Sequence, residues 1–348
     1  MVAGVGAPLV LLSKRLGEPG PHERRLEELG ARVRSAALLT RDEIAAEATD
    51  ADIIILGAVE PFDAQALSTL PKLQAIVRRG VGYDNVDVEE ATRLGIVVAN
   101  VPDASVEEVS DHALALLIAL ERNVVALDRA VRQGRWHADP AGLQRVRVSS
   151  RRLGDLTLGI VGFGRIGRAL ARKAKSVYPR ILVADPLLDQ TTARSAGVVL
   201  VGLTELLTNA DHVSLHAPMD SSNRHLIGAK ELAQIRSGAV LVNTARGGLV
   251  DEDALVAAIR SGRLRGAGLD VTATEPVAEH AAVLSEQDTL LLTGHSAAWS
   301  ETAAHALAAG SVDAAEALIT GRLPRSLVNP QVLDSDSLRI PGLAGVAH

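Results

Sequence analysis

Three side chains with complementary chemistry follow three separate predicted strands of the chain: Arg246, Glu275 and His295. An imidazole such as that of His295 exchanges a proton near neutral pH, and a neighbouring carboxylate orients the ring and supports its positive charge. A guanidinium offers a fixed fork of donors, which can hold a substrate carboxylate and polarise the carbonyl beside it. We therefore predict a catalytic site in which His295 exchanges the proton, Glu275 supports it, and Arg246 binds a small acid.

A glycine loop earlier in the chain indicates the second reactant. Residues 156–161 form a short apolar run typical of a buried strand, and Gly162, Gly164 and Gly167 follow at the G-x-G-x-x-G spacing. The first glycine allows the turn out of the strand, the second lets the backbone approach a pyrophosphate, and the third lets helix and sheet pack closely. A helix that begins here presents unpaired N–H groups to phosphate. The loop therefore predicts a dinucleotide site.

An acidic residue completes this fingerprint. Residues 181–184 form a second apolar strand that ends on Asp185. Its carboxylate should accept hydrogen bonds from the adenosine ribose and repel a 2′-phosphate. We therefore predict NAD (NADH) as the cofactor and NADP as less favoured. Arg165 lies inside the glycine loop and could bind pyrophosphate, so this preference is not absolute. The residues predicted to bind the cofactor are Gly162, Phe163, Gly164, Arg165, Ile166, Gly167, Asp185, His216, Ala217, Pro218, Thr244, Ala245 and Asp270.

The elements that must position these residues alternate between strand and helix patterns, which predicts an α/β fold. The short apolar strands expected after residue 155 are 156–161, 181–184, 198–201, 212–215, 239–242, 266–269 and 289–292. With helices between them they predict a doubly wound parallel Rossmann sheet, in which ligands bind beyond the carboxyl ends of the strands. Because Arg246, Glu275 and His295 follow such ends, we expect them to meet beside the cofactor.

Residues 8–101 repeat the βα plan on a smaller scale and predict a second α/β domain, flavodoxin-like or Rossmann-like. This part holds no G-x-G-x-x-G, so it should not bind a dinucleotide. The turn Gly80-Val81-Gly82 follows its strand at 73–77. Backbone N–H groups in this turn could bind the substrate carboxylate, so we expect this domain to contribute to substrate binding.

The segment between the two domains predicts a contact with a second subunit. A helix that is apolar on most sides ends near Arg122, so it should be buried between domains or between subunits. Residues 134–152 lack periodicity and carry five arginines and Trp136. We expect residues 105–152 to form a helical and extended dimerisation arm, in which the extended part, 134–152, crosses to a partner. Trp136 would be an interface anchor, and the protein a homodimer.

The composition of the chain excludes several kinds of partner and of chemistry. The chain has 348 residues, a net charge of −6 and no cysteine. No basic block interleaved with aromatic residues occurs, so nucleic acid is not an expected partner. No apolar stretch reaches spanning length, so neither is a membrane. Disulfides and thiol catalysis are excluded, and no cluster of metal ligands stands out. We expect a cytoplasmic protein of two domains.

The chain resembles the NAD-dependent D-2-hydroxyacid dehydrogenases. The matching stretches are RRGVGYDNVDVEEA, NVPDASVEEVSDHALALLIAL, GIVGFGRIGRAL, HAPM, LVNTARGGLVDEDAL, GAGLDVTATEP and GHSAAWS. They occur in order along almost the whole chain. The resemblance implies Arg246, Glu275 and His295 as the catalytic set, a small 2-hydroxy or 2-oxo acid as substrate, a dimer and a split substrate domain. The boundaries expected on this basis are 1–101 and 301–348 for the substrate domain and 102–300 for the NAD-binding domain.

Within this family, the segment from His295 to Trp299 resembles the branch that includes the C-terminal-binding corepressors. It departs from that branch at Gly294, where a proline is usual, and at Trp299, which lies one position further from the histidine. Trp299 could wall the substrate pocket or pack against the last helix. Two other functions stay open. The first is an NAD-sensing interaction module without turnover. The second is oxidation of an anion such as phosphite, which ranks lower because a lysine would be expected in the turn where Val81 stands. Glu275 argues against a formate dehydrogenase, in which a glutamine pairs with the histidine.

Overall fold

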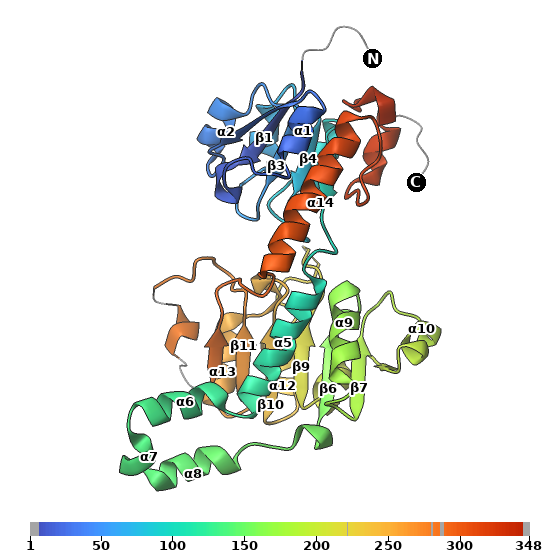
Figure 1. The fold of residues 1–348 in the computed structure, drawn as a ribbon. Coiled ribbons are helices and arrows are strands. Elements are labelled where there is room, and N and C mark those ends of the chain that lie inside the picture. The colour runs from blue at the N-terminus through green and yellow to red at the C-terminus, as the bar shows by residue number, and fades with distance from the viewer. Residues whose placement is uncertain (1–6, 221, 280, 286–288, 344–348) are drawn as a thin grey trace. The chain divides into compact units, whose positions relative to one another are not determined.

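The computed structural model describes residues 7–220, 222–279, 281–285 and 289–343 (Figure 1). The chain divides into two compact units: unit 1 comprises Met1–Ser105 and Ser300–His348, and unit 2 comprises Val106–Trp299. Each unit is built on its own parallel sheet, which confirms the predicted α/β fold. No helix in the described part of the chain is both long and apolar enough to cross a membrane.

The sheet of unit 1 has the strand order β2-β1-β3-β4-β5. Its strands are β1 (Leu9–Ser13), β2 (Arg32–Ala36), β3 (Ile53–Leu56), β4 (Ala75–Arg78) and β5 (Val97–Asn100). Its helices are α1 (Arg24–Glu28), α2 (Arg41–Glu47), α3 (Ala64–Ser68), α4 (Val88–Arg93) and α14 (Glu301–Ile319). Every residue of β1 and β3 is buried, as expected for parallel strands that helices cover on both faces. This strand order is the flavodoxin-like one, which confirms the prediction for the smaller domain.

The helix α14 completes the core of unit 1, although it lies far from the sheet in the sequence. It begins after Ser300, whose hydroxyl accepts a hydrogen bond from the Ala303 N–H at 2.9 Å. Its residues Val312 and Leu318 are buried in one hydrophobic cluster with Val10 of β1. The first strand and the last long helix therefore share one core, and α14 also contacts β3, β4 and β5 (Figure 1).

The sheet of unit 2 has the strand order β12-β11-β10-β9-β6-β7-β8, with parallel pairing throughout. Its strands are β6 (Thr157–Val161), β7 (Arg180–Ala184), β8 (Val199–Leu200), β9 (His212–Leu215), β10 (Ala239–Asn243), β11 (Leu264–Leu269) and β12 (Leu290–Leu292). Its helices are α5 (Val106–Glu121), α6 (Val124–Arg132), α7 (Arg135–Ala138), α8 (Pro140–Val148), α9 (Arg165–Ala174), α10 (Gln190–Ser195), α11 (Leu203–Asn209), α12 (Ala229–Gln234) and α13 (Glu252–Arg260). The order reverses between β6 and β9, which confirms the doubly wound Rossmann fold.

The arm between α5 and β6 differs from its prediction. Residues 134–152 are not extended, because α7 and α8 occupy most of them (lower left of Figure 1). The helix α8 begins at Pro140, where the Asp139 side chain accepts a backbone N–H of the first turn at 2.8 Å. Exposed apolar side chains remain on the arm, with Val131 42%, Trp136 54% and Val148 69% accessible. The arm thus offers an apolar surface on short helices rather than on an extended strand.

Candidate active site

The glycine loop connects β6 to α9. Gly162 has a φ of +90°, and a Cβ there would lie 2.6 Å from the carbonyl carbon of His216. A Cβ at Gly167 would lie 2.2 Å from the Gly162 carbonyl oxygen, so α9 packs directly on the strand end. Gly164 is the N-cap of α9, and nothing lies within 4 Å of the position that its Cβ would take. The first amides of α9 therefore adjoin open space that a pyrophosphate can approach.

Asp185 follows β7 and holds the glycine loop. The Phe163 N–H donates to Asp185 Oδ2 at 2.6 Å, and the Leu187 N–H donates to Oδ1 at 2.8 Å. Each carboxylate oxygen can accept more than one hydrogen bond, so further acceptor sites remain on this half-buried side chain. An acceptor fixed beside the loop suits the hydroxyls of a ribose.

Two buried polar atoms at neighbouring strand ends have no hydrogen-bond partner among the described residues: His216 Nδ1 after β9 and Thr244 Oγ1 after β10. The other ring nitrogen of His216, Nε2, bonds the Ser214 hydroxyl at 2.8 Å. Burial lowers the pKa of His216 to about 4, so the ring is neutral at neutral pH. Buried polar atoms normally have partners, and a polar dinucleotide at this edge would supply them. With the glycine loop and Asp185, these residues fit NAD.

His295 and Glu275 are hydrogen-bonded to one another. His295 Nδ1 lies 2.6 Å from Glu275 Oε2, and because a carboxylate only accepts, Nδ1 donates and Nε2 is left for other partners. Partial burial raises the pKa of Glu275, but the hydrogen bond and charge of His295 and the N–H of Thr272 outweigh it, so this pKa lies below its ordinary value. The side chains of His295 and Glu275 are 41% and 35% exposed, which leaves them accessible.

Arg246 follows β10, beside the strand that leads to Glu275. Because β10, β11 and β12 pair in parallel, the segments that carry Arg246, Glu275 and His295 leave the same edge of the sheet. A Cβ at Gly247 would lie 2.0 Å from the carbonyl group of Thr272, so the loop of Arg246 packs on the loop that precedes Glu275. The half-buried Arg246 side chain donates through Nη1 to the carbonyl of the preceding residue at 2.6 Å. The structure thus places the two loops in contact.

The backbone that carries His295 explains an unexpected feature of the sequence. Gly294 and His295 both have left-handed backbones, with φ of +61° and +55°. Proline cannot occupy position 294 in this conformation, because its ring holds φ near −65°. The Asp270 carboxylate accepts the N–H groups of Ser296 at 2.8 Å and Ala297 at 3.0 Å, just after the turn. Sequence reasoning assigned Asp270 to the cofactor and missed that it also anchors this loop.

The remaining predicted site residues are distributed over both units. The turn Gly80-Val81-Gly82 belongs to unit 1, after β4, and its part in substrate binding stays a prediction. Ala217 and Pro218 follow His216 on the loop after β9. Trp299, the last residue of unit 2, is 72% exposed and so does not pack as a core residue. Among the described residues, no three side chains are grouped as metal ligands.

Known proteins resemble this chain in sequence and in structure. The family profile described as "D-isomer specific 2-hydroxyacid dehydrogenase, NAD binding domain" matches residues 114–297. A glyoxylate reductase from Korarchaeum cryptofilum is 39% identical over 84% of this chain and 86% of its own length. A D-3-phosphoglycerate dehydrogenase from Methanocaldococcus jannaschii is 35% identical over 90% of the chain, which spans only 58% of that protein. The structure of an Aquifex aeolicus D-lactate dehydrogenase, complexed with NAD and lactic acid, superposes with a TM-score of 0.79 at 26% identity, over 92% and 98% of the two chains.

The chain therefore belongs to the D-isomer specific 2-hydroxyacid dehydrogenase family. It is an oxidoreductase of the NAD-dependent kind, and the predicted cofactor is confirmed.

Proposed function

We propose that the protein interconverts a small 2-oxo acid and the corresponding D-2-hydroxy acid, with Arg246, Glu275 and His295 as its catalytic residues. The hydrogen bond between His295 Nδ1 and Glu275 Oε2, at 2.6 Å, carries this proposal. It fixes the ring and leaves Nε2 to exchange a proton with the substrate oxygen. The relatives include a glyoxylate reductase and a D-lactate dehydrogenase complexed with lactic acid, and these names support a small acid as substrate.

The three side chains have distinct roles in the proposed reaction. When bound, NADH supplies the hydride that reduces the carbonyl carbon of the 2-oxo acid. The Arg246 guanidinium binds the substrate carboxylate and polarises the neighbouring carbonyl. His295 donates the Nε2 proton to the oxygen as negative charge develops there, and Glu275 stabilises the positive charge of the ring until that proton leaves. In the oxidation direction, His295 takes the hydroxyl proton instead.

The other binding residues are part of the same proposal. The glycine loop, Asp185, His216 and Thr244 would bind the dinucleotide, and Asp270 would contact its nicotinamide. We further propose that unit 1 acts as the substrate domain, through the N–H groups of Gly80-Val81-Gly82, and that unit 2 is the NAD-binding domain. The apolar surface of the arm supports a homodimer, and the cytoplasm is the expected location.

The test is a panel of 2-oxo acids, glyoxylate and pyruvate included, with NADH and NADPH, for the wild-type protein and His295→Ala. We expect the variant to bind NADH normally, because His295 is not in the cofactor set, and to lose at least ~100-fold in kcat, the usual scale for a general acid. Unchanged turnover would remove His295 from the mechanism. Tight NADH binding without turnover of any acid by the wild type would instead favour a corepressor-like module.

A further inference from the structure

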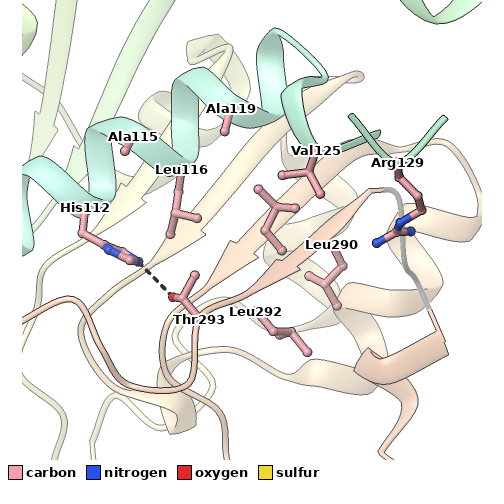
Figure 2. Close-up of a pocket in the computed structure, with 10 residues that line it drawn as sticks. His112, Ala115, Leu116, Ala119, Val125, Arg129, Leu290, Leu292 and Thr293 are labelled. Atoms are coloured by element: carbon pink, nitrogen blue, oxygen red, sulfur yellow. Dashed lines mark hydrogen bonds between the residues drawn. The ribbon is translucent and has the colours of Figure 1, made fainter. Parts of the chain in front are cut away.

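A chain of hydrogen bonds connects the helix α5 to the loop of His295. His112 Nε2, on α5, lies 2.9 Å from the Thr293 hydroxyl oxygen, as Figure 2 shows. The same hydroxyl lies 2.6 Å from Oδ1 of Asp270. Asp270 is 3% exposed, so the connection ends on a buried carboxylate. None of the catalytic roles proposed above uses His112 or Thr293.

The two hydrogen bonds of this connection run in the same direction, from His112 toward Asp270. A carboxylate accepts hydrogen bonds and donates none, so the single hydroxyl hydrogen of Thr293 points to Asp270. The Thr293 oxygen must then accept the hydrogen bond from His112, which means that Nε2 of His112 carries a hydrogen. His112 thus donates to Thr293, and Thr293 donates to Asp270.

The same carboxylate holds the backbone on both sides of His295. Asp270 binds the Thr293 hydroxyl before the turn, and it accepts the N–H groups of Ser296 and Ala297 after the turn. Between these contacts, the left-handed backbone of His295 is unfavourable for a residue that has a Cβ. The bonds to Asp270 therefore hold His295 in a conformation that an isolated loop would leave.

The ring of His112 depends on this hydrogen bond for its orientation. It lines a pocket of ≈ 370 Å³ together with apolar side chains of α5 and β12, among them Leu116 and Leu292 (Figure 2). The His112 side chain is 26% exposed, so packing does not enclose it on all sides. Of the pocket-lining residues that Figure 2 draws, Thr293 is the one hydrogen-bonded to the ring.

We propose that His112 is a positioning residue for catalysis: through Thr293 and Asp270, it fixes the turn that aims the His295 imidazole at Glu275 and the substrate. This inference rests on the proposed role of His295. Without the donor on His112, the Thr293 hydroxyl has no partner for its acceptor side and rotates more freely. The turn then samples other positions, and small errors of position at the reacting atoms cost large factors in rate.

Two pairs of variants test the connection. His112→Leu and Thr293→Val remove the donor or the hydroxyl at similar volume, whereas His112→Gln and Thr293→Ser keep them. We expect kcat to fall ~10-fold in the first two with the KM for NADH within ~2-fold of wild type, and to stay within ~3-fold in the second two. The double variant His112→Leu/Thr293→Val should be no slower than Thr293→Val, because both break one connection. Thr208→Val is the control, since its hydroxyl bonds local α11 carbonyls.

Equal losses in His112→Leu and His112→Gln, or full activity in a folded His112→Leu protein, would overturn the proposal. A second measurement tests the proposed connection independently of the proposed function. In protein labelled with ¹⁵N-histidine, the ring signals of His295 are assigned by comparison with His295→Asn. They should shift in His112→Leu and Thr293→Val and stay in His112→Gln and Thr293→Ser. If the wild type turned over no acid, unmoved His295 signals in His112→Leu would still refute the connection.

Discussion

At the scale of a single residue, Asp185 accepts hydrogen bonds from the N–H groups of Phe163 and Leu187. In the cofactor site proposed above, it also presents a negative charge to the ribose. The negative charge, rather than the hydrogen bonds to the loop, disfavours a 2′-phosphate. The preference for NADH over NADPH should therefore depend on this carboxylate more than on any other side chain of the loop.

For Asp185→Ser, we predict that kcat/KM with NADH falls ~10-fold or more, since hydrogen bonds to a charged acceptor are lost. The ratio of NADPH to NADH efficiency should rise, because the repulsion is gone. Steady-state kinetics with both cofactors measure this change. Asp189→Ser is the matched control, because Asp189 caps α10 and is exposed. An unchanged cofactor ratio in Asp185→Ser would show that other residues determine the preference.

At the scale of elements, a buried polar cluster joins the two ends of the arm. Glu121, the last residue of α5, is fully buried and accepts Arg151 Nη2 and the Arg151 N–H, each at 2.7 Å. His212 Nε2 lies 3.0 Å from the same carboxylate, and the Tyr178 hydroxyl lies 2.7 Å from His212 Nδ1. Burial lowers the pKa of His212, so the neutral ring donates to Glu121 and accepts from Tyr178. The ion pair between Glu121 and Arg151 therefore joins the two ends of the arm.

Replacing Glu121 should test how much this cluster contributes. We predict that Glu121→Gln lowers the free energy of unfolding by about 3 kcal/mol at pH 7, because Arg151 keeps a partly buried charge without its partner. Urea unfolding measures the loss. The control is Glu107→Gln on the same helix, whose 57% exposed carboxylate pairs with Arg172 and should contribute under about 1 kcal/mol. Similar losses in both variants would contradict a special role for the buried cluster.

The same carboxylate predicts a pH dependence of stability. Burial raises the pKa of Glu121, but its bonds to His212 and Arg151 outweigh that and lower it from 4.5 to about 2. Its contribution is complete above pH 4.5 and decreases as pH falls toward 2, because the unfolded chain binds a proton that the folded chain resists. Thermal midpoints between pH 5 and 3 should therefore fall less steeply in Glu121→Gln than in the wild type. Parallel curves would assign the acid sensitivity to other groups.

Elements whose type is determined by burial could be predicted from the sequence. The part of the arm whose apolar residues face solvent could not. The aliphatic runs of β6, β9 and β10 matched their strands within a residue or two, because strands covered on both faces need apolar residues throughout. The part of the arm at 134–152 was predicted wrongly because α7 is a single turn and its Trp136 side chain faces solvent, so no helical periodicity of burial exists. In this part of the arm, the sequence pattern that indicates a helix is Asp139 followed by Pro140, which marks the start of α8.

Part of the candidate site could be predicted from the sequence, and part could not. The pairing of His295 with Glu275 followed from their residue types and from the strand ends that carry them. The contacts of Asp270 with the turn could not be predicted, because they join its side chain to backbone N–H groups of Ser296 and Ala297. Every residue except proline has a backbone N–H, so the sequence does not indicate which of these groups donate to a carboxylate.

At the scale of the whole molecule, the exposed arm predicts an association of two chains. Trp136 is 54% exposed among other accessible apolar side chains, and tryptophan is a frequent energetic anchor of interfaces. We predict two chains per particle for the wild type by sedimentation, and a dissociation constant at least ~30-fold higher for Trp136→Glu. Leu187→Glu, at an apolar residue away from the arm that is more exposed still, should leave the mass unchanged. A monomeric wild type would contradict the homodimer.

The shared core of β1 and α14 has a consequence for synthesis of the chain. The residues of unit 2 are contiguous, from Val106 to Trp299, whereas unit 1 combines both ends of the chain. As the ribosome extends the polypeptide, unit 2 can finish folding while Val10 and its neighbours still wait for Val312 and Leu318 to emerge. Until then one face of the first sheet is covered only in part, by α1, so the nascent N-terminal segment should be the part of the chain that chaperones hold longest.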